Sequence, residues 1–154
     1  MAVFQTRISR ARLVFSPFSA EQMAQIAEIV AQSIRDRIHR GETVEDSAAK
    51  PLKPGREVNG HRLRGYPDYK IGRGLQPIRD WTWTGRTMRA LKVLTANENV
   101  AKIGFADPVA DYRAHINNRR EKAFGVSPND RKALNAALMA TLRQVRVVQF
   151  RKAA

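Results

Sequence analysis

Residues 19–41, SAEQMAQIAEIVAQSIRDRIHRG, decide the fold because they carry the most regular helical pattern in the chain. Gln22 follows Ser19 by three residues, which is the spacing of a capping box at the start of a helix. Gly41 offers a left-handed stop at the end. Between them one apolar stripe recurs at steps of three and four: Met23, Ile26, Val30, Ile34 and Ile38. The pattern predicts a helix over residues 20–40 that packs on a sheet.

Five other segments alternate apolar or β-branched residues with polar ones, as strands do. Two of them, residues 91–95 and 100–105, flank the polar turn 96–99 and predict a β-hairpin. The other three predict short single strands: residues 12–18, residues 80–84 with Trp81 and Trp83 on one face, and residues 146–150.

Three further helices are predicted from their first residues. Asp107 and Ser127 are each followed by a proline, an order typical of a cap residue before the first helical position. Thr84 can cap a short helix over residues 85–90. The two longer helices have apolar sides: Val109, Tyr112 and Ile116 in the first, which is expected to end near residues 117–118, and Leu134, Leu138 and Leu142 in the second, over residues 128–145. Together the elements predict an α+β fold, with a small, mostly antiparallel sheet packed by an N-terminal and a C-terminal helix.

The size of the chain and its charge narrow the possible functions. Its 154 residues fit a single domain, residues 1–154. Lys and Arg number 28 against 14 Asp and Glu, a formal net charge of +14, which favours association with polyanions or acidic protein surfaces. No cysteine, signal-sequence pattern or apolar run of membrane-spanning length occurs. We therefore expect a protein of the cytosol, or of a particle assembled there, with no membrane partner.

Residues 41–80 differ from the rest because glycine and proline interrupt every periodicity. Between Lys50 and Arg73, seven basic residues stand against two acidic ones, a net charge of +5, and Tyr66 and Tyr69 lie among them. A segment of this composition buries too little apolar surface to order itself. We expect a long, extended basic arm that is mobile alone and becomes ordered by contact. A simple linker is the alternative interpretation.

The motifs that would carry catalysis or ligand binding are weak. Gly72-Arg73-Gly74 lacks the third glycine of a dinucleotide loop, and no phosphate-binding G-x-x-x-x-G-K-[ST] occurs. His39, His61 and His115 do not have the spacing of metal ligands. We therefore expect no cofactor, no metal and no enzymatic activity. Trp81 and Trp83 are interpreted first as core residues, with a subunit interface or stacking on nucleic-acid bases as alternatives.

Four motifs occur in order between residues 66 and 127: Tyr66-Pro67-Asp68-Tyr69-Lys70, Thr84-Gly85-Arg86-Thr87-Met88, Ile103-Gly104-Phe105, and the stretch from Asn117 to Ser127. This order resembles the virion-morphogenesis family of tailed bacteriophages, the neck or tail-completion proteins that join head to tail. In that family a Tyr/Lys-rich segment precedes a TG-x-(L/M) step, a hairpin ending in (I/V)GF and an N-x-RR-x-FFG-(L/V)-S element. The paired phenylalanines of the family are here Ala123-Phe124.

The resemblance implies copies that close into a ring, sixfold or twelvefold, between the capsid portal or adaptor and the tail. It implies a place in the virion neck, assembly in the host cytoplasm, and non-specific contact with double-stranded DNA in the lumen. The residues expected at the interfaces are Arg56, Arg62, Arg64, Tyr66, Tyr69, Lys70, Arg73, Arg119 and Arg120. The residues expected to be structural are Thr84, Gly85, Gly104, Phe105 and Phe124, the last in an apolar pocket. A stand-alone basic nucleic-acid-binding protein and a small hydrolase of unfamiliar type are the alternatives.

Overall fold

The computed structural model describes the backbone of residues 3–7, 10–14, 18–81 and 85–152, and the side chains of residues 18–81 and 85–144. The elements in chain order are β1 (Val3–Arg7), β2 (Arg10–Val14), α1 (Ala20–His39), β3 (Arg56–Val58), β4 (His61–Leu63), α2 (Tyr66–Ile71), α3 (Arg86–Ala90), β5 (Leu91–Ala96), β6 (Val100–Phe105), α4 (Pro108–Arg120) and α5 (Pro128–Lys152).

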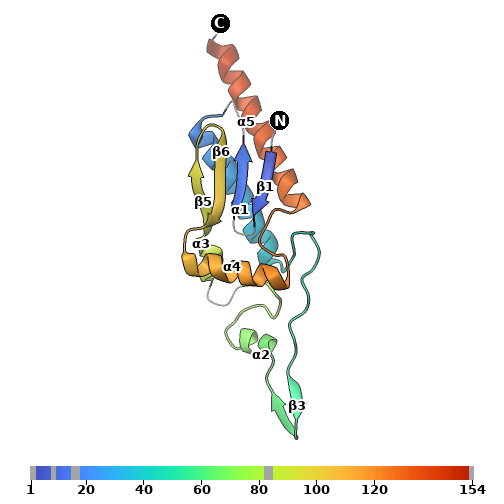
Figure 1. Ribbon diagram of the computed structural model, residues 1–154. Helices are drawn as coiled ribbons and strands as arrows, with labels where there is room; N and C mark the ends of the chain where they lie inside the picture. The colour runs from blue at the N-terminus through green and yellow to red at the C-terminus, as the bar shows by residue number, and fades with distance from the viewer. Residues whose placement is uncertain (1–2, 8–9, 15–17, 82–84, 153–154) are drawn as a thin grey trace.

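Four strands form one antiparallel sheet in the order β1-β2-β6-β5. The pairing of β2 with β6, in which Leu13 lies opposite Ala101, joins the N-terminal hairpin to the hairpin β5–β6. Helix α1 contacts β5 and β6 on one face of the sheet, and α5 packs along α1. Figure 1 shows both helices behind the sheet, with α4 crossing beneath its end. The predicted α+β fold, with a small antiparallel sheet and N- and C-terminal helices, is confirmed.

Helix α1 forms as its sequence predicts. The side chain of Ser19 accepts a hydrogen bond from the backbone N–H of Gln22 at 3.2 Å, and the Gln22 side chain accepts one from the backbone N–H of Ser19 at 2.9 Å. At the other end Gly41 has a φ of 74°, a left-handed conformation that glycine adopts without strain. All five residues of the apolar stripe are buried.

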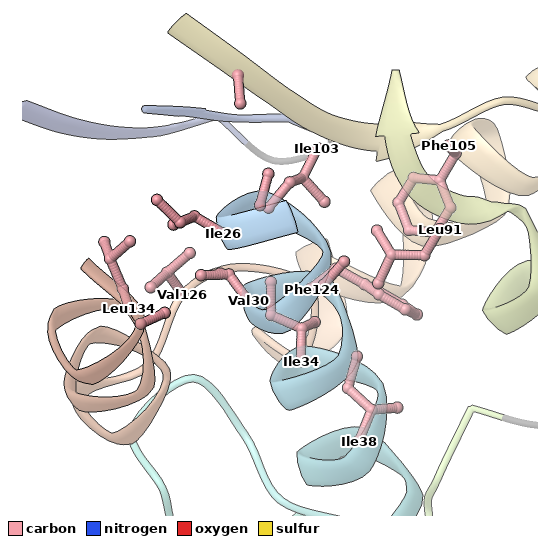
Figure 2. Packing of buried hydrophobic residues seen from close by; sticks show 14 of the residues in the cluster. Ile26, Val30, Ile34, Ile38, Leu91, Ile103, Phe105, Phe124, Val126 and Leu134 are labelled. Carbon is pink, nitrogen blue, oxygen red and sulfur yellow. The ribbon is translucent and has the colours of Figure 1, made fainter. Parts of the chain in front are cut away.

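The core lies between α1, the sheet and α5. In Figure 2 the side chains of Ile26, Val30 and Ile34 point from α1 toward strand residues on one side and toward the α5 region on the other. Leu134 and Leu138 of α5 are buried as predicted, and Leu142 packs against the cluster. At the lower end of the sheet Phe124 meets Phe105 edge to face, with ring centroids 5.4 Å apart. Burying this many large apolar side chains is the main favourable contribution that holds α1, α5 and the sheet together.

Two predicted strands are wrong or displaced. The chain does not form a strand over residues 146–150, because α5 continues through Lys152. No glycine or proline interrupts residues 129–152, so nothing ends the helix before this alternating segment. The strand expected over residues 12–18 lies at β2 (Arg10–Val14), and β1 before it was not predicted.

Two further expectations concern the end of the sheet. Trp81 has a φ of 51° and is not in a strand, while residues 82–84, including Trp83 and the expected cap Thr84, lie outside the described residues. Trp81 is nevertheless partly buried against the core, edge to face with Phe124 at a centroid distance of 6.2 Å. Helix α4 buries Ala110 and Ala114 and exposes Val109 and Tyr112, so its expected apolar side is wrong. Ala110 and Ala114 are both fully buried, so small residues form the packed side of α4.

Candidate assembly arm and basic pocket

A projecting arm is the most distinctive feature of the molecule, and it extends away from the body on the side of α4 (Figure 1). The sequence places its start at residue 41, but residues 41–50 belong to the body. Thr43 is buried, and the backbone N–H of Val44 donates to the carbonyl oxygen of Lys122 at 2.9 Å. We therefore define the arm as residues 51–79.

A small cluster of polar contacts joins the two segments at the base of the arm. Arg79 Nε donates to the carbonyl oxygen of Lys50 at 2.9 Å, which joins the outgoing and returning chains. Glu121, just after α4, accepts a hydrogen bond from the backbone N–H of Lys50 at 2.8 Å. The second oxygen of the same carboxylate lies 3.4 Å from Arg79 Nε. These contacts fix where the arm leaves the body.

The arm is not structureless, in contrast to the prediction. Its outer half is the antiparallel hairpin β3–β4, in which Val58 pairs with His61. The connection is Asn59-Gly60, and both residues have positive φ, 52° and 75°. This pair is the preferred sequence for a two-residue hairpin turn. All six strand residues are exposed, so local turn chemistry and backbone pairing form this hairpin without a core beneath it.

Two segments of the chain pass very close to each other at the base of the hairpin. A Cβ atom on Gly65 would lie 2.2 Å from the backbone nitrogen of Gly55, and one on Gly55 would lie 2.4 Å from the carbonyl oxygen of Leu63. Only glycine fits at either position. Helix α2 starts directly after this crossing, where the Asp68 carboxylate accepts a hydrogen bond from the N–H of Gly65 at 2.8 Å.

Lys70 was expected at an interface, and the structure contradicts this. Its side chain is buried, 1% exposed, and forms an ion pair with the buried Asp80. Its ammonium group also donates to the carbonyl oxygen of Ile78 at 2.7 Å. A buried charge needs such partners because desolvation alone is costly. Lys70 therefore fixes α2 against the returning chain and is not available to a partner.

The other residues expected at interfaces lie on the surface. Arg56, Arg62, Arg64, Tyr66, Tyr69 and Arg73 are exposed on the arm, and Arg119 and Arg120 are exposed at the end of α4. Large apolar side chains are exposed there too. Of nine such side chains among the described residues, five belong to the arm: Val58, Leu63, Tyr66, Tyr69 and Ile71.

The residues expected to be structural lie in the body. Phe105 and Phe124 are buried, Gly104 is in β6, and Gly85 precedes α3 with a φ of 69°. The segment around Phe124 is held by Asn118, whose side chain accepts from the N–H groups of Ala123 and Phe124 at 2.9 and 2.8 Å. Asn118 thus anchors the segment that carries the buried Phe124.

A pocket of about 720 Å³ lies where the arm meets the body. The arm contributes Leu52, Lys53, Tyr66 and Ile78, α3 contributes Arg86, and α4 contributes Arg113, Asn117 and Arg120. The three α4 residues are spaced by four and three positions, so they share one side of the helix. Trp81 lines the pocket as well. Burial, followed by the charge of Asp80, raises the pKa of the Tyr66 hydroxyl.

The basic groups of this pocket fall into two sets. Lys70, Arg79 and Arg86 are each paired with a carboxylate, those of Asp80, Glu121 and Asp107. Lys53, Arg113 and Arg120 form no ion pair with any residue that the structure describes. The pocket therefore combines apolar surface with three uncompensated positive charges.

Sequence reasoning missed a buried ionic network between the helices. Arg37 of α1 pairs with Asp130 of α5 at 3.0 Å, and both side chains are 1% exposed. Arg37 also donates to the carbonyl oxygens of Ala123 and Gly125 at 3.0 and 2.9 Å. Asp130 stands three residues after the cap Ser127, which is the spacing of a capping box. This spacing could have predicted that Asp130 lies at the start of α5, but not that it pairs with Arg37.

Other kinds of site were sought in the described part of the chain. Across residues 18–81 and 85–144 no group of three or more His, Cys, Asp or Glu side chains is arranged to hold a metal ion. None of the helices described is both long and apolar enough to span a membrane. Comparisons with known protein families, with curated proteins and with solved structures found no match. The arm and the pocket are therefore the features of the molecule that bear on its function.

Proposed function

We propose that this protein is a structural component of a tailed-bacteriophage neck, which assembles into a ring between the capsid portal or adaptor and the tail. The observation that carries the proposal is the arm, where exposed apolar side chains and basic groups project together from a well-packed body. Five large apolar side chains exposed on one short projecting segment favour a site of protein–protein contact. The order of sequence motifs from Tyr66 to Ser127 is consistent with the same role.

In the proposed mechanism the body and the arm have different tasks. The body offers a head-to-tail surface whose rotation closes a ring of identical copies. The arm of each copy lies on its neighbour or on the next ring, where Leu63, Tyr66, Tyr69 and Ile71 lose their exposure to water. The arginines of the arm pair with acidic groups of the partner. No catalytic step is required, and the protein acts as a joint without enzymatic activity.

A hairpin deletion tests this proposal. Gly55 and Gly65 nearly touch, so residues 56–64 can be removed and the ends joined by two glycines without disturbing α2 or the body. In the genome that encodes this chain, we expect gene disruption to yield heads separated from tails in electron micrographs. Wild-type protein supplied in trans restores joined particles, and the hairpin-deleted protein does not.

The matched control exchanges exposed arginines outside the arm, Arg131→Gln with Arg143→Gln, and is expected to restore joining. Complete, infectious particles formed without the protein would overturn the proposed function. Full rescue by the hairpin-deleted protein would leave a role in the neck possible but remove the hairpin β3–β4 from it. The nucleic-acid-binding alternative gives a different result, because the isolated monomer then shifts duplex DNA in gels with strong salt dependence.

A further inference from the structure

The pocket at the base of the arm has a composition that the arm's own role does not explain. It is formed jointly by the arm, α3 and α4, and it combines a partly apolar wall with Lys53, Arg113 and Arg120. Its volume of about 720 Å³ falls within the range of specific ligand sites, which is about 300–1,000 Å³.

The unpaired basic groups define the chemistry of the occupant. Arg113 and Arg120 stand on one side of α4, two turns apart, so their side chains can hold two acidic groups along one line. Guanidinium groups bind carboxylates through paired, charge-assisted hydrogen bonds. Three cations in one concave site repel each other unless an anion lies between them. The three unpaired cations therefore favour an anionic occupant.

The wall of the pocket favours a peptide over a nucleic acid. Leu52, Ile78 and the partly buried Trp81 give the pocket apolar surface that suits aliphatic or aromatic side chains. A recess of about 720 Å³ can take a few side chains or one base but not a duplex, whose major groove alone is wide enough to admit an α-helix. A single base stacked on Trp81 is the remaining nucleic-acid possibility, and the experiment below distinguishes it.

A second copy of this chain is a poor source of the anionic segment. Six of its acidic side chains already form ion pairs within the described residues. Basic residues outnumber acidic ones by 28 to 14 over the whole chain. An excess of this size leaves few acidic groups on a second copy that could enter the pocket.

We infer that this pocket is a docking site for an acidic peptide segment of a different protein, with carboxylates on Arg113, Arg120 and Lys53 and an apolar side chain against Trp81. The identity of that protein as a neck partner rests on the proposed function. The chemistry of the pocket does not rest on it. Because the arm forms one wall, docking also holds the arm in place relative to α4.

The test uses the full chain and two fluorescein-labelled probes of similar negative charge, a peptide of ten glutamates with one central tryptophan and a ten-nucleotide oligothymidylate. Binding is followed by fluorescence anisotropy. The pocket variant is Arg113→Gln with Arg120→Gln. The control, Arg131→Gln with Arg143→Gln, lowers the net charge by the same amount on exposed positions of α5. We expect the pocket variant to weaken peptide binding at least about tenfold and the control less than about threefold.

Several results would overturn the inference. Equal losses in the two variants would show attraction by overall charge alone. Tighter, pocket-dependent binding of the oligothymidylate would assign the site to single-stranded nucleic acid. Absence of peptide binding to the wild-type protein at low salt would remove the site altogether. A peptide that carries a photo-reactive phenylalanine gives an independent check on the unmutated protein, with crosslinks expected at Leu52, Lys53 and α4.

The two proposals fail separately. If the peptide does not bind but particles still require the protein, only the docking site is wrong. If particles form without the protein but the peptide binds through Arg113 and Arg120, the neck assignment is wrong and the pocket remains a peptide site.

Discussion

Arg37 is the single residue on which the packing of α1, α5 and the Phe124 segment converges. Its guanidinium group is completely enclosed and meets Asp130 and backbone carbonyl oxygens. Asp130 in turn accepts from Ser33 Oγ at 2.6 Å and from the N–H of Ser127 at 3.0 Å. The network is thus satisfied on both sides, which is the condition under which a buried ion pair is tolerated.

Substituting Arg37→Met tests this network. It leaves the Asp130 carboxylate buried without its arginine, and removing one partner of a buried pair costs about 3–5 kcal/mol. We expect a loss of that size in the free energy of unfolding, measured by urea denaturation. Arg40→Met is the control, because the Arg40–Glu42 pair is exposed and such pairs contribute about 0–1 kcal/mol. Similar losses in the two variants would contradict the assignment.

A second residue-scale prediction concerns Asp107, the cap of α4. The hydrogen bond from Arg86 lowers the pKa of the Asp107 carboxyl below its ordinary value. Because the folded-state pKa is the lower one, the resulting stabilisation is fully present above the unfolded pKa of about 3.9 and is lost as the pH falls through the folded value. In Arg86→Gln we expect the Asp107 pKa to rise, as followed by NMR of the carboxyl carbon. Lys102→Gln should leave it unchanged, and an unchanged value in Arg86→Gln would contradict the pairing.

Single residues were the hardest features to predict from the sequence. Arg37 falls within the helix predicted over residues 20–40, but its partner is 93 positions away in the chain and only the packing of α5 on α1 brings them together. Lys70 looked like other basic residues of a polar segment, although it is buried with Asp80. Composition cannot separate a buried, paired lysine from an exposed one.

At the scale of elements, the Lys70–Asp80 pair fixes α2 to the chain segment that returns from the arm to the body. We expect Lys70→Met to accelerate backbone hydrogen exchange over residues 66–80 by about tenfold or more, since Asp80 stays buried after losing its lysine. Exchange in α1 should not change. The double variant Lys70→Met with Asp80→Leu should recover part of the protection. Unchanged exchange in the single variant would show that the pair does not order the arm.

The crossing of Gly55 and Gly65 gives a second prediction for the arm. In Gly65→Ala the new methyl group meets backbone atoms 2.2 and 2.4 Å away, and overpacking typically costs about 1–3 kcal/mol. We expect the hairpin to open, so that trypsin cleaves faster at Arg62 and Arg64. Gly72→Ala is the control, because no atom lies closer than 3.5 Å to its added carbon. Cleavage at the wild-type rate in Gly65→Ala would contradict the close crossing.

Elements with strong local signals were predictable, and those that depend on neighbours were not. Capping chemistry and a regular stripe determine α1, and alternation around a polar turn determines β5–β6. The turn Asn59-Gly60 is the sequence signal for the hairpin β3–β4. It was missed because residues 41–80 were interpreted from their overall composition. Residues 146–150 alternate like a strand, yet they continue a helix that nothing interrupts. Of the candidate site, the exposed arm residues were predictable and the pocket was not, because three separate segments form it.

For the whole molecule, the net charge of +14 is the dominant property. Self-repulsion among like charges destabilises the compact state, and salt screens it. We expect the melting temperature to rise by several degrees, roughly 2–6 °C, when sodium chloride is increased from about 20 to about 300 mM. Potassium chloride should give the same rise at equal ionic strength. A melting temperature that falls with salt would indicate that exposed ion pairs outweigh the repulsion.

The hydrogen bond between Arg79 and the carbonyl oxygen of Lys50 has a consequence for how the gene can be altered. It brings together two points of the chain that are 29 residues apart, so everything between them is an insert with adjoining ends. Such an insert can be exchanged for a longer or shorter one by a simple splice, with no strand of the central sheet rerouted. The folded body is therefore a scaffold for an insertion, and the same scaffold can carry insertions of different lengths for different partners.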